Sequence, residues 1–252
     1  MSRLFVLAVN AWQENLRGRF FLLSFFFGLI LLYVSLLLGI LAADQELRVL
    51  VDFGLALIEI IGLAGALFGA CTALLREIEN KTIYLVLSRP VRRWELLVGR
   101  FLGLMLSAWA AMAVMGLFHL ALLFLKGWSW ENAYLWAWLG SCAKVWVTAS
   151  LGLFLSLFSS SVMTAGAIAA ILWTLGHFLP EMRALIARSP DQAAALPMQL
   201  LSLVIPDLQC LNLRDKIAAS SFDQAWLGLG YAALYSLVWT GLSVWLLKRK
   251  EF

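Results

Sequence analysis

The chain has 252 residues, of which 63% are hydrophobic and only 13% are charged. Soluble domains are about 45–50% apolar and about 25% charged, so a soluble globule of this size could not cover so much apolar surface. Intrinsic disorder is excluded too, because it requires low hydrophobicity and high charge. Membrane β-barrels alternate apolar and polar residues along short strands, whereas this chain runs apolar over long stretches. The composition therefore predicts an all-α integral membrane protein.

The first segment, residues 1–19, carries apolar residues at helical spacing. Leu4, Leu7, Ala8 and Ala11 would share one face of a helix, with polar residues largely between them. A helix of this kind lies in the membrane interface with its apolar face toward the hydrocarbon. We therefore expect an N-terminal interfacial helix.

Six stretches are long and apolar enough to cross a membrane, since a core of about 30 Å requires roughly 20 apolar residues in a helix. In chain order they are Phe20–Ala42, Phe53–Leu75, Phe101–Leu125, Asn132–Phe158, Val162–Pro180 and Trp226–Leu247. Six spans would place both termini on the same side of the membrane.

The basic residues divide unevenly between the two sides of this arrangement. The two ends and the 76–100 loop hold twelve Lys and Arg residues, whereas the opposite side holds six, four of them in the long 181–225 loop. Lys and Arg concentrate in short cytoplasmic loops, and long loops count for less. Both termini are therefore predicted to be cytoplasmic. The net charge of +4 follows from this topology, so no nucleic-acid partner is expected.

The 181–225 loop would lie outside the cytoplasm. Its apolar stretches Met182–Ile186 and Met198–Ile205 are too short to span a membrane. We expect them to form short re-entrant or surface helices that cap the outer mouth, and Asp207–Asp215 to form another short helix.

Four ionisable residues lie inside the predicted spans, where such residues are functional candidates by default. Glu59 and Lys144 both lie toward the outer half, so pairing or snorkelling is favoured over contact with a substrate. His119 and His177 stand on separate helices, and satisfied packing is favoured over metal binding. These four residues are the candidates for a transport pathway.

Small residues form two further patterns. Gly62, Gly65 and Gly69 share a face of the second span, and Gly99 and Gly103 repeat the spacing at the start of the third. This spacing predicts close helix packing, either within the subunit or across a dimer.

The 76–100 segment holds nine of the 34 charged residues. Pro90 breaks it, because the residue before a proline avoids the helical conformation. We expect a short amphipathic helix, a proline corner, and a second helix that starts near Val91 and enters the membrane. The charge pattern alone leaves open whether the first helix is a solvated face or a docking element.

This segment resembles the cytoplasmic loop of ABC-2 type transport permeases. Lys81 departs from the family pattern, in which a small residue usually precedes the threonine. The stretches Ala8–Arg19 and Ile205–Leu213 also resemble the subgroup that includes the permeases for copper-enzyme maturation. The loop residues that match the family pattern are Glu77, Thr82, Leu87, Ser88, Pro90, Val91, Arg93, Glu95, Gly99 and Arg100.

The resemblance implies a permease subunit of the bacterial cytoplasmic membrane, paired with a second copy and with two copies of a separate ABC ATPase. ATP and Mg²⁺ would bind to that ATPase, and no cofactor is expected in this chain. The 181–225 helices would be an extracytoplasmic gate, the Ser159–Ser161 turn a minor ATPase contact, and export the expected direction. The implied docking residues of the coupling helix and its corner are Arg76, Glu77, Glu79, Lys81, Thr82, Tyr84, Leu87, Ser88, Pro90, Arg93 and Glu95.

The sequence independently supports the prediction that the ATPase is a separate chain. A P-loop requires Gly-Lys followed by Ser or Thr, and no glycine in this chain is followed by lysine. An ATP-driven transporter would therefore need its motor on another chain. The alternatives are an ion-coupled transporter or channel, which would favour internal repeats and several midplane charges, and a membrane assembly subunit that transports nothing.

Overall fold

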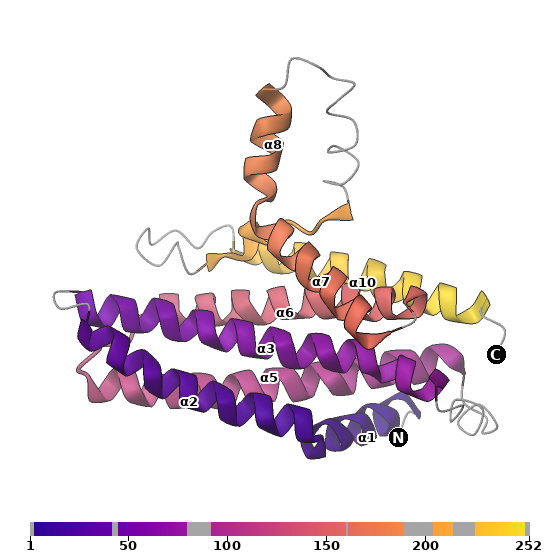
Figure 1. Ribbon diagram of the computed structural model, residues 1–252, viewed down its shortest axis with the longest axis horizontal. Helices are drawn as coiled ribbons and strands as arrows, with labels where there is room; N and C mark the ends of the chain where they lie inside the picture. The colour runs from indigo at the N-terminus through magenta and orange to yellow at the C-terminus, as the bar shows by residue number, and fades with distance from the viewer. Residues whose placement is uncertain are drawn as a thin grey trace.

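The computed structural model describes residues 3–41, 45–79, 92–159, 161–188, 204–213 and 225–249, and this part of the chain contains helices and no strand. The long helices lie side by side in a bundle, while one short helix points away from it (Figure 1). The elements are α1 (Arg3–Arg17), α2 (Arg19–Leu41), α3 (Glu46–Glu79), α5 (Arg93–Leu125), α6 (Asn132–Phe158), α7 (Val162–His177), α8 (Leu179–Arg188), the 3-10 turn η2 (Gln209–Leu211) and α10 (Ala225–Arg249).

Four helices, α3, α5, α6 and α10, are long and apolar enough to cross a membrane. The bent pair α7–α8 makes a fifth if it is counted as one span. Helix α2 covers the first expected span, and its described part includes the shorter apolar stretch Phe25–Val34. The chain is thus an all-α, multi-pass membrane protein, and the count of six spans stays a prediction.

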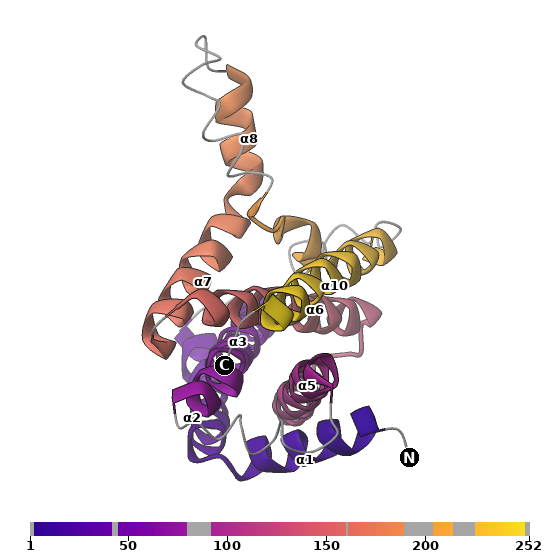
Figure 2. The same cartoon turned by 90° about the vertical axis from the view of Figure 1, so that its right-hand side faces the viewer.

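The fifth expected span, Val162–Pro180, differs from the structure. Helix α7 ends at His177, and α8 starts at Leu179 after a bend of 64°. The 16 residues of α7 reach about 24 Å, which is less than a hydrocarbon core of about 30 Å. Helix α8 turns away from the bundle, as both views show (Figures 1 and 2).

Two other boundaries also differ from the predictions. Helix α3 continues without a break through Arg76–Glu79, so this part of the 76–100 loop is the end of a long helix rather than a separate one. Of the expected helix Asp207–Asp215, residues 214–215 lie outside the described part of the chain, and the rest contains the 3-10 turn Gln209–Leu211, with Leu213 also in 3-10 conformation. The described segment 204–213 thus consists of short turns joined by irregular backbone.

Helix α6 is the centre of the bundle. In its most apolar window 78% of the residues are buried, against 22% in α10, which lies at the periphery. The main apolar core joins α6 to α3 and α5, with Ile58, Leu104, Met112, Val145 and Ala149 among its buried members. A polar side chain on the inner face of α6 is therefore shielded from lipid and water alike.

Helix α1 runs across the bundle beneath α5 (Figure 2). Glycines of α5 make this approach close: a Cβ on Gly99 would lie 2.7 Å from Leu7 Cβ, and one on Gly103 would lie 2.6 Å from Ala11 Cβ. The Gly99–Gly103 step therefore packs α1 within the subunit, which the spacing alone left open. The expected N-terminal helix is present, and its orientation across the bundle suits a helix in the membrane interface.

Candidate functional site: a buried polar cluster

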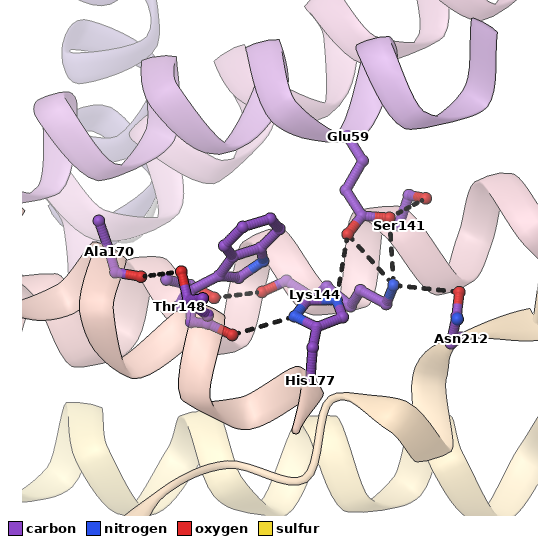
Figure 3. A network of polar contacts seen from close by, with 9 residues as sticks. Glu59, Ser141, Lys144, Thr148, Ala170, His177 and Asn212 are labelled. Carbon is purple, nitrogen blue, oxygen red and sulfur yellow. Dashed lines mark hydrogen bonds and ion pairs between the residues drawn. The ribbon is translucent and has the colours of Figure 1, made fainter. Parts of the chain in front are cut away.

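Helices α3 and α6 bring three polar side chains together in the middle of the bundle (Figure 3). Ser141 and Lys144 are three residues apart on α6 and so share a face that looks toward α3. Lys144 Nζ donates to Glu59 Oε1 at 3.1 Å and to Oε2 at 3.2 Å, and Ser141 Oγ donates to Oε2 at 2.9 Å. The pairing of Glu59 with Lys144 that the sequence allowed is present.

The irregular 204–213 segment adds a fourth member from outside the helices. Lys144 Nζ donates to Asn212 Oδ1 at 3.3 Å. From α7, His177 Nε2 lies 3.7 Å from Glu59 Oε1, while its Nδ1 donates to the backbone oxygen of Trp173 at 3.0 Å. We call Glu59, Ser141, Lys144, His177 and Asn212 the polar cluster. It joins α3, α6, α7 and the 204–213 segment at one point (Figure 3).

Three glycines allow the 204–213 segment to come this close to the helices. A Cβ on Gly140 of α6 would lie 2.5 Å from Leu211 O, and one on Gly176 of α7 would lie 2.6 Å from Pro206 O. On α10, a Cβ on Gly228 would lie 3.1 Å from Cys210 O. Irregular backbone at membrane depth is tolerated only where protein or a wet cavity covers it, and here three helices supply that cover.

The Glu59–Lys144 ion pair is almost completely buried, so its loss would be costly. The side chain of Lys144 is 1% exposed and that of Glu59 is 4% exposed. The attraction between two buried opposite charges offsets the cost of removing them from water only if their geometry is good and further hydrogen bonds satisfy both groups. Ser141 and Asn212 provide such hydrogen bonds. The arrangement is suited to hold four segments in register.

His119 lies in a separate place and is satisfied there by neighbours. Its Nε2 is 3.2 Å from Leu50 O, which can only accept, and its Nδ1 is 2.9 Å from the hydroxyl of Tyr134. One proton on Nε2 therefore satisfies both ring nitrogens. Among the described residues, no three His, Cys, Asp or Glu side chains form a group that could hold a metal ion.

A family model described as ABC-2 family transporter protein matches residues 17–252. The chain belongs to the ABC-2 transporter family. A comparison with curated proteins gives no match. Membership makes this ABC-2 transporter protein a membrane subunit of an ABC transporter, a class that works in the bilayer together with an ABC ATPase. The family predicted from the sequence is thereby confirmed, and the copper-enzyme subgroup stays a prediction.

The expected docking residues of the ABC-2 protein fall into three groups. Arg76, Glu77 and Glu79 form the last turn of α3, where only the backbone is described. Arg93 and Glu95 begin α5. The remaining docking residues lie outside the described part of the chain; they are Lys81, Thr82, Tyr84, Leu87, Ser88 and Pro90.

Arg93 and Glu95 both have contacts inside the ABC-2 subunit. Arg93 Nη1 donates to Leu247 O at 3.2 Å, near the end of α10. Glu95 Oε2 accepts from the backbone N–H of Arg92 at 3.0 Å and so caps the start of α5. In the Ser159–Ser161 turn, Ser161 Oγ accepts from the N–H of Met163 and starts α7. These contacts give Arg93, Glu95 and Ser161 a structural role, whatever their role in docking.

Two members of the polar cluster, Ser141 and Asn212, were not among the residues predicted from the sequence. Ser141 had a signal, because it lies three residues before Lys144 on the same helix face. Asn212 had none, because a neutral residue in an irregular segment has no pattern that places it beside a buried lysine.

Proposed function

We propose that this ABC-2 transporter protein is the permease subunit of an exporter, driven by a separate ATPase chain docked on the 76–100 loop. The match to the ABC-2 family over residues 17–252 carries the proposal.

The lengths of α3 and α5 support a docking element at one end of the bundle. These helices have 34 and 33 residues and reach about 50 Å each, about 20 Å more than the hydrocarbon core. The end of α3 and the start of α5 carry Arg76, Glu77, Glu79, Arg92 and Arg93. Charged helix ends that extend past the membrane suit a docking surface for a soluble partner.

Six spans with cytoplasmic termini fit the arrangement of the ends. The start of α5, the end of α10 and helix α1 lie together, as the contacts of Arg93 with Leu247 O and of Arg100 with Glu14 show. Helix α2 has an apolar outer surface that suits contact with lipid; its exposed side chains include Phe26, Ile30, Tyr33, Leu37 and Ile40. We therefore count α2 among the spans, together with the bent pair α7–α8 taken as one span.

The complete transporter would contain two permease copies and two ATPase copies in the bacterial cytoplasmic membrane. ATP and Mg²⁺ would bind to the ATPase, and this chain would bind no cofactor. We further propose that the chain belongs to the subgroup that includes the copper-enzyme-maturation permeases, so substrates of that subgroup are the first to test.

A charge-reversal experiment tests the docking. The tagged chain is purified from membranes, the ABC ATPase that accompanies it is identified by mass spectrometry, and the two are then co-expressed. Reversal of Glu77 and Glu79 to lysine should reduce ATPase recovery at least tenfold, because the end of α3 would then carry the opposite charge at the proposed docking surface. Arg93 is a poor choice for this test, because its bond to Leu247 O confounds the result.

Lys248→Glu is the matched control, since it reverses an exposed charge at the same end of the bundle. It should leave ATPase recovery unchanged. Unchanged recovery in the Glu77/Glu79 reversal, with a monodisperse membrane protein, would contradict docking on this loop. Transport that follows an ion gradient without ATP would indicate the ion-coupled alternative, and an ATPase complex that transports nothing would indicate the assembly subunit.

A further inference from the structure

Helix α1 has two exposed faces besides the one that packs on α5. On the first, Phe5 and Trp12 lie seven residues apart and are 51% and 36% exposed. On the second, the exposed side chains of Asn10, Gln13 and Arg17 recur at helical spacing. An apolar face beside a polar face is typical of a helix at the boundary between hydrocarbon and water. Helix α1 can therefore contact protein, lipid tails and lipid headgroups at the same time.

The end of α1 lies where the chain enters the membrane. Only Gly18 separates α1 from α2, and Arg19 is followed at once by the apolar residues of α2. The N–H of Gly18 donates to Asn15 O at 3.0 Å, and the N–H of Leu22 donates to Gly18 O at 3.1 Å, so the corner is hydrogen-bonded. Arg17 is exposed in the last turn of α1. Two arginines thus flank a tight corner at the expected level of the headgroups.

The charge of this corner suits an anionic partner. Residues 3–19 contain three arginines, Arg3, Arg17 and Arg19, against one acidic residue, Glu14. Glu14 Oε2 lies 3.8 Å from Arg100 Nη1 of α5, so a cation of another helix partly compensates that carboxylate. An anionic leaflet strengthens binding by about fivefold for each Lys or Arg near its surface. Headgroups of anionic phospholipids supply negative charge at this depth.

Helix α1 is also tied to the start of α5, which belongs to the proposed docking end. The close contacts at Gly99 and Gly103 lie about 9 and 15 Å along α5 from Arg93. The Arg100–Glu14 ion pair joins the same two helices. Displacement of α1 would uncover the glycine face of α5 to lipid and water. The position of α1 and the order of the first turns of α5 are therefore linked.

We propose that anionic phospholipid headgroups bind the α1–α2 corner at Arg17 and Arg19, and that this contact holds α1, and with it the start of α5, in place. The lipid contact rests on the cytoplasmic orientation proposed above, because the cytoplasmic leaflet is the anionic one. Its effect on the docking end rests on the proposed function. The lipid composition of the inner leaflet would then set how firmly the docking end is held.

Hydrogen exchange of the full chain in nanodiscs tests this contact without ATPase or nucleotide. Nanodiscs of phosphatidylcholine are compared with nanodiscs that also contain phosphatidylglycerol. The anionic lipid should slow exchange in α1 and in residues 97–104 of α5 at least tenfold, because two arginines contribute about fivefold each and exchange follows local opening. High salt should weaken the effect, since it screens exposed charges.

A matched pair of double variants locates the site. Arg17→Gln combined with Arg19→Gln should reduce the slowing to less than about twofold. The control, Arg92→Gln combined with Lys248→Gln, removes the same charge from two exposed side chains at the same end of the bundle. It should keep the tenfold slowing, because neither residue lies on α1. Equal losses in both double variants would indicate attraction by net charge alone and would overturn the proposed site.

Gly103→Leu tests the link from α1 to α5, because a side chain there would push the two helices apart. Phosphatidylglycerol should then still slow exchange in α1, but no longer in residues 97–104. If Gly103→Leu does not give a monodisperse protein, Gly103→Ala takes its place, since even a Cβ there would lie 2.6 Å from Ala11 Cβ. A response of residues 97–104 equal to that of the wild type would overturn the link.

Equal exchange of α1 with and without phosphatidylglycerol would overturn the proposal. Protection of α1 that follows the number of copies per nanodisc rather than the lipid would overturn it too, because a second copy would then cover α1. The assay contains no ATPase, so its failure leaves the docking proposal intact. Failure of the docking experiment would equally leave a measured lipid effect standing.

Discussion

The ammonium of Lys144 compensates the carboxylate of Glu59, and Lys144→Met tests how much depends on it. The substitution keeps an unbranched apolar stem but leaves Glu59, whose side chain is 4% exposed, without its opposite charge. Removal of one partner of a buried ion pair typically costs about 3–5 kcal/mol. We therefore expect a marked loss of stability from a change that creates no large cavity.

The expected size can be converted into a melting temperature. For a chain of 150–250 residues, 1 kcal/mol corresponds to about 2–4 °C, so Lys144→Met should lower Tm by about 6–20 °C. The double variant Glu59→Gln with Lys144→Met removes both charges, and neutral replacement of a buried pair is often nearly neutral. It should recover most of the loss and lie within about 4 °C of the wild type.

Thermal unfolding in detergent, followed by tryptophan fluorescence, measures these shifts. Lys126→Met is the control, because Lys126 is paired with Glu46 at 2.6 Å but both side chains are about one-third exposed. An exposed pair contributes about 1 kcal/mol or less, so this variant should change Tm by less than about 4 °C. The reasoning fails if Lys144→Met behaves like Lys126→Met, or if the double variant loses as much as the single one.

Two other predictions concern the end of the bundle that we propose to be cytoplasmic. Gly103→Leu should force α1 away from α5, because a Cβ there would lie 2.6 Å from Ala11 Cβ; we expect a loss of about 1–3 kcal/mol by thermal unfolding. Gly241→Leu, which has open space around it, should have little effect, and equal losses in both would refute close α1–α5 packing. A fluorescent protein fused after Phe252 should fluoresce and a phosphatase fused there should be inactive, whereas an active phosphatase would overturn the cytoplasmic C-terminus.

The sequence by itself determined the class of the protein and the places of its long helices. Helix type and position follow from apolar length, because a membrane leaves the backbone no other way to satisfy its hydrogen bonds within one segment. The expected spans Phe101–Leu125 and Asn132–Phe158 therefore lie within α5 and α6, and α6 has the predicted bounds. The family followed from the resemblance of the 76–100 segment to the loop pattern of ABC-2 permeases, and the family model matches residues 17–252.

Only the tertiary structure decided which faces meet. A sequence pattern gives the face on which Glu59 or Gly103 lies, but the neighbour depends on how distant helices pack, and apolar helix surfaces in lipid have no pattern that names a partner. The structure thus assigned Gly103 to α1 rather than to a second copy, and Arg93 to the end of α10. It also placed Asn212 beside Lys144, because glycines on α6, α7 and α10 leave room for irregular backbone inside the bundle.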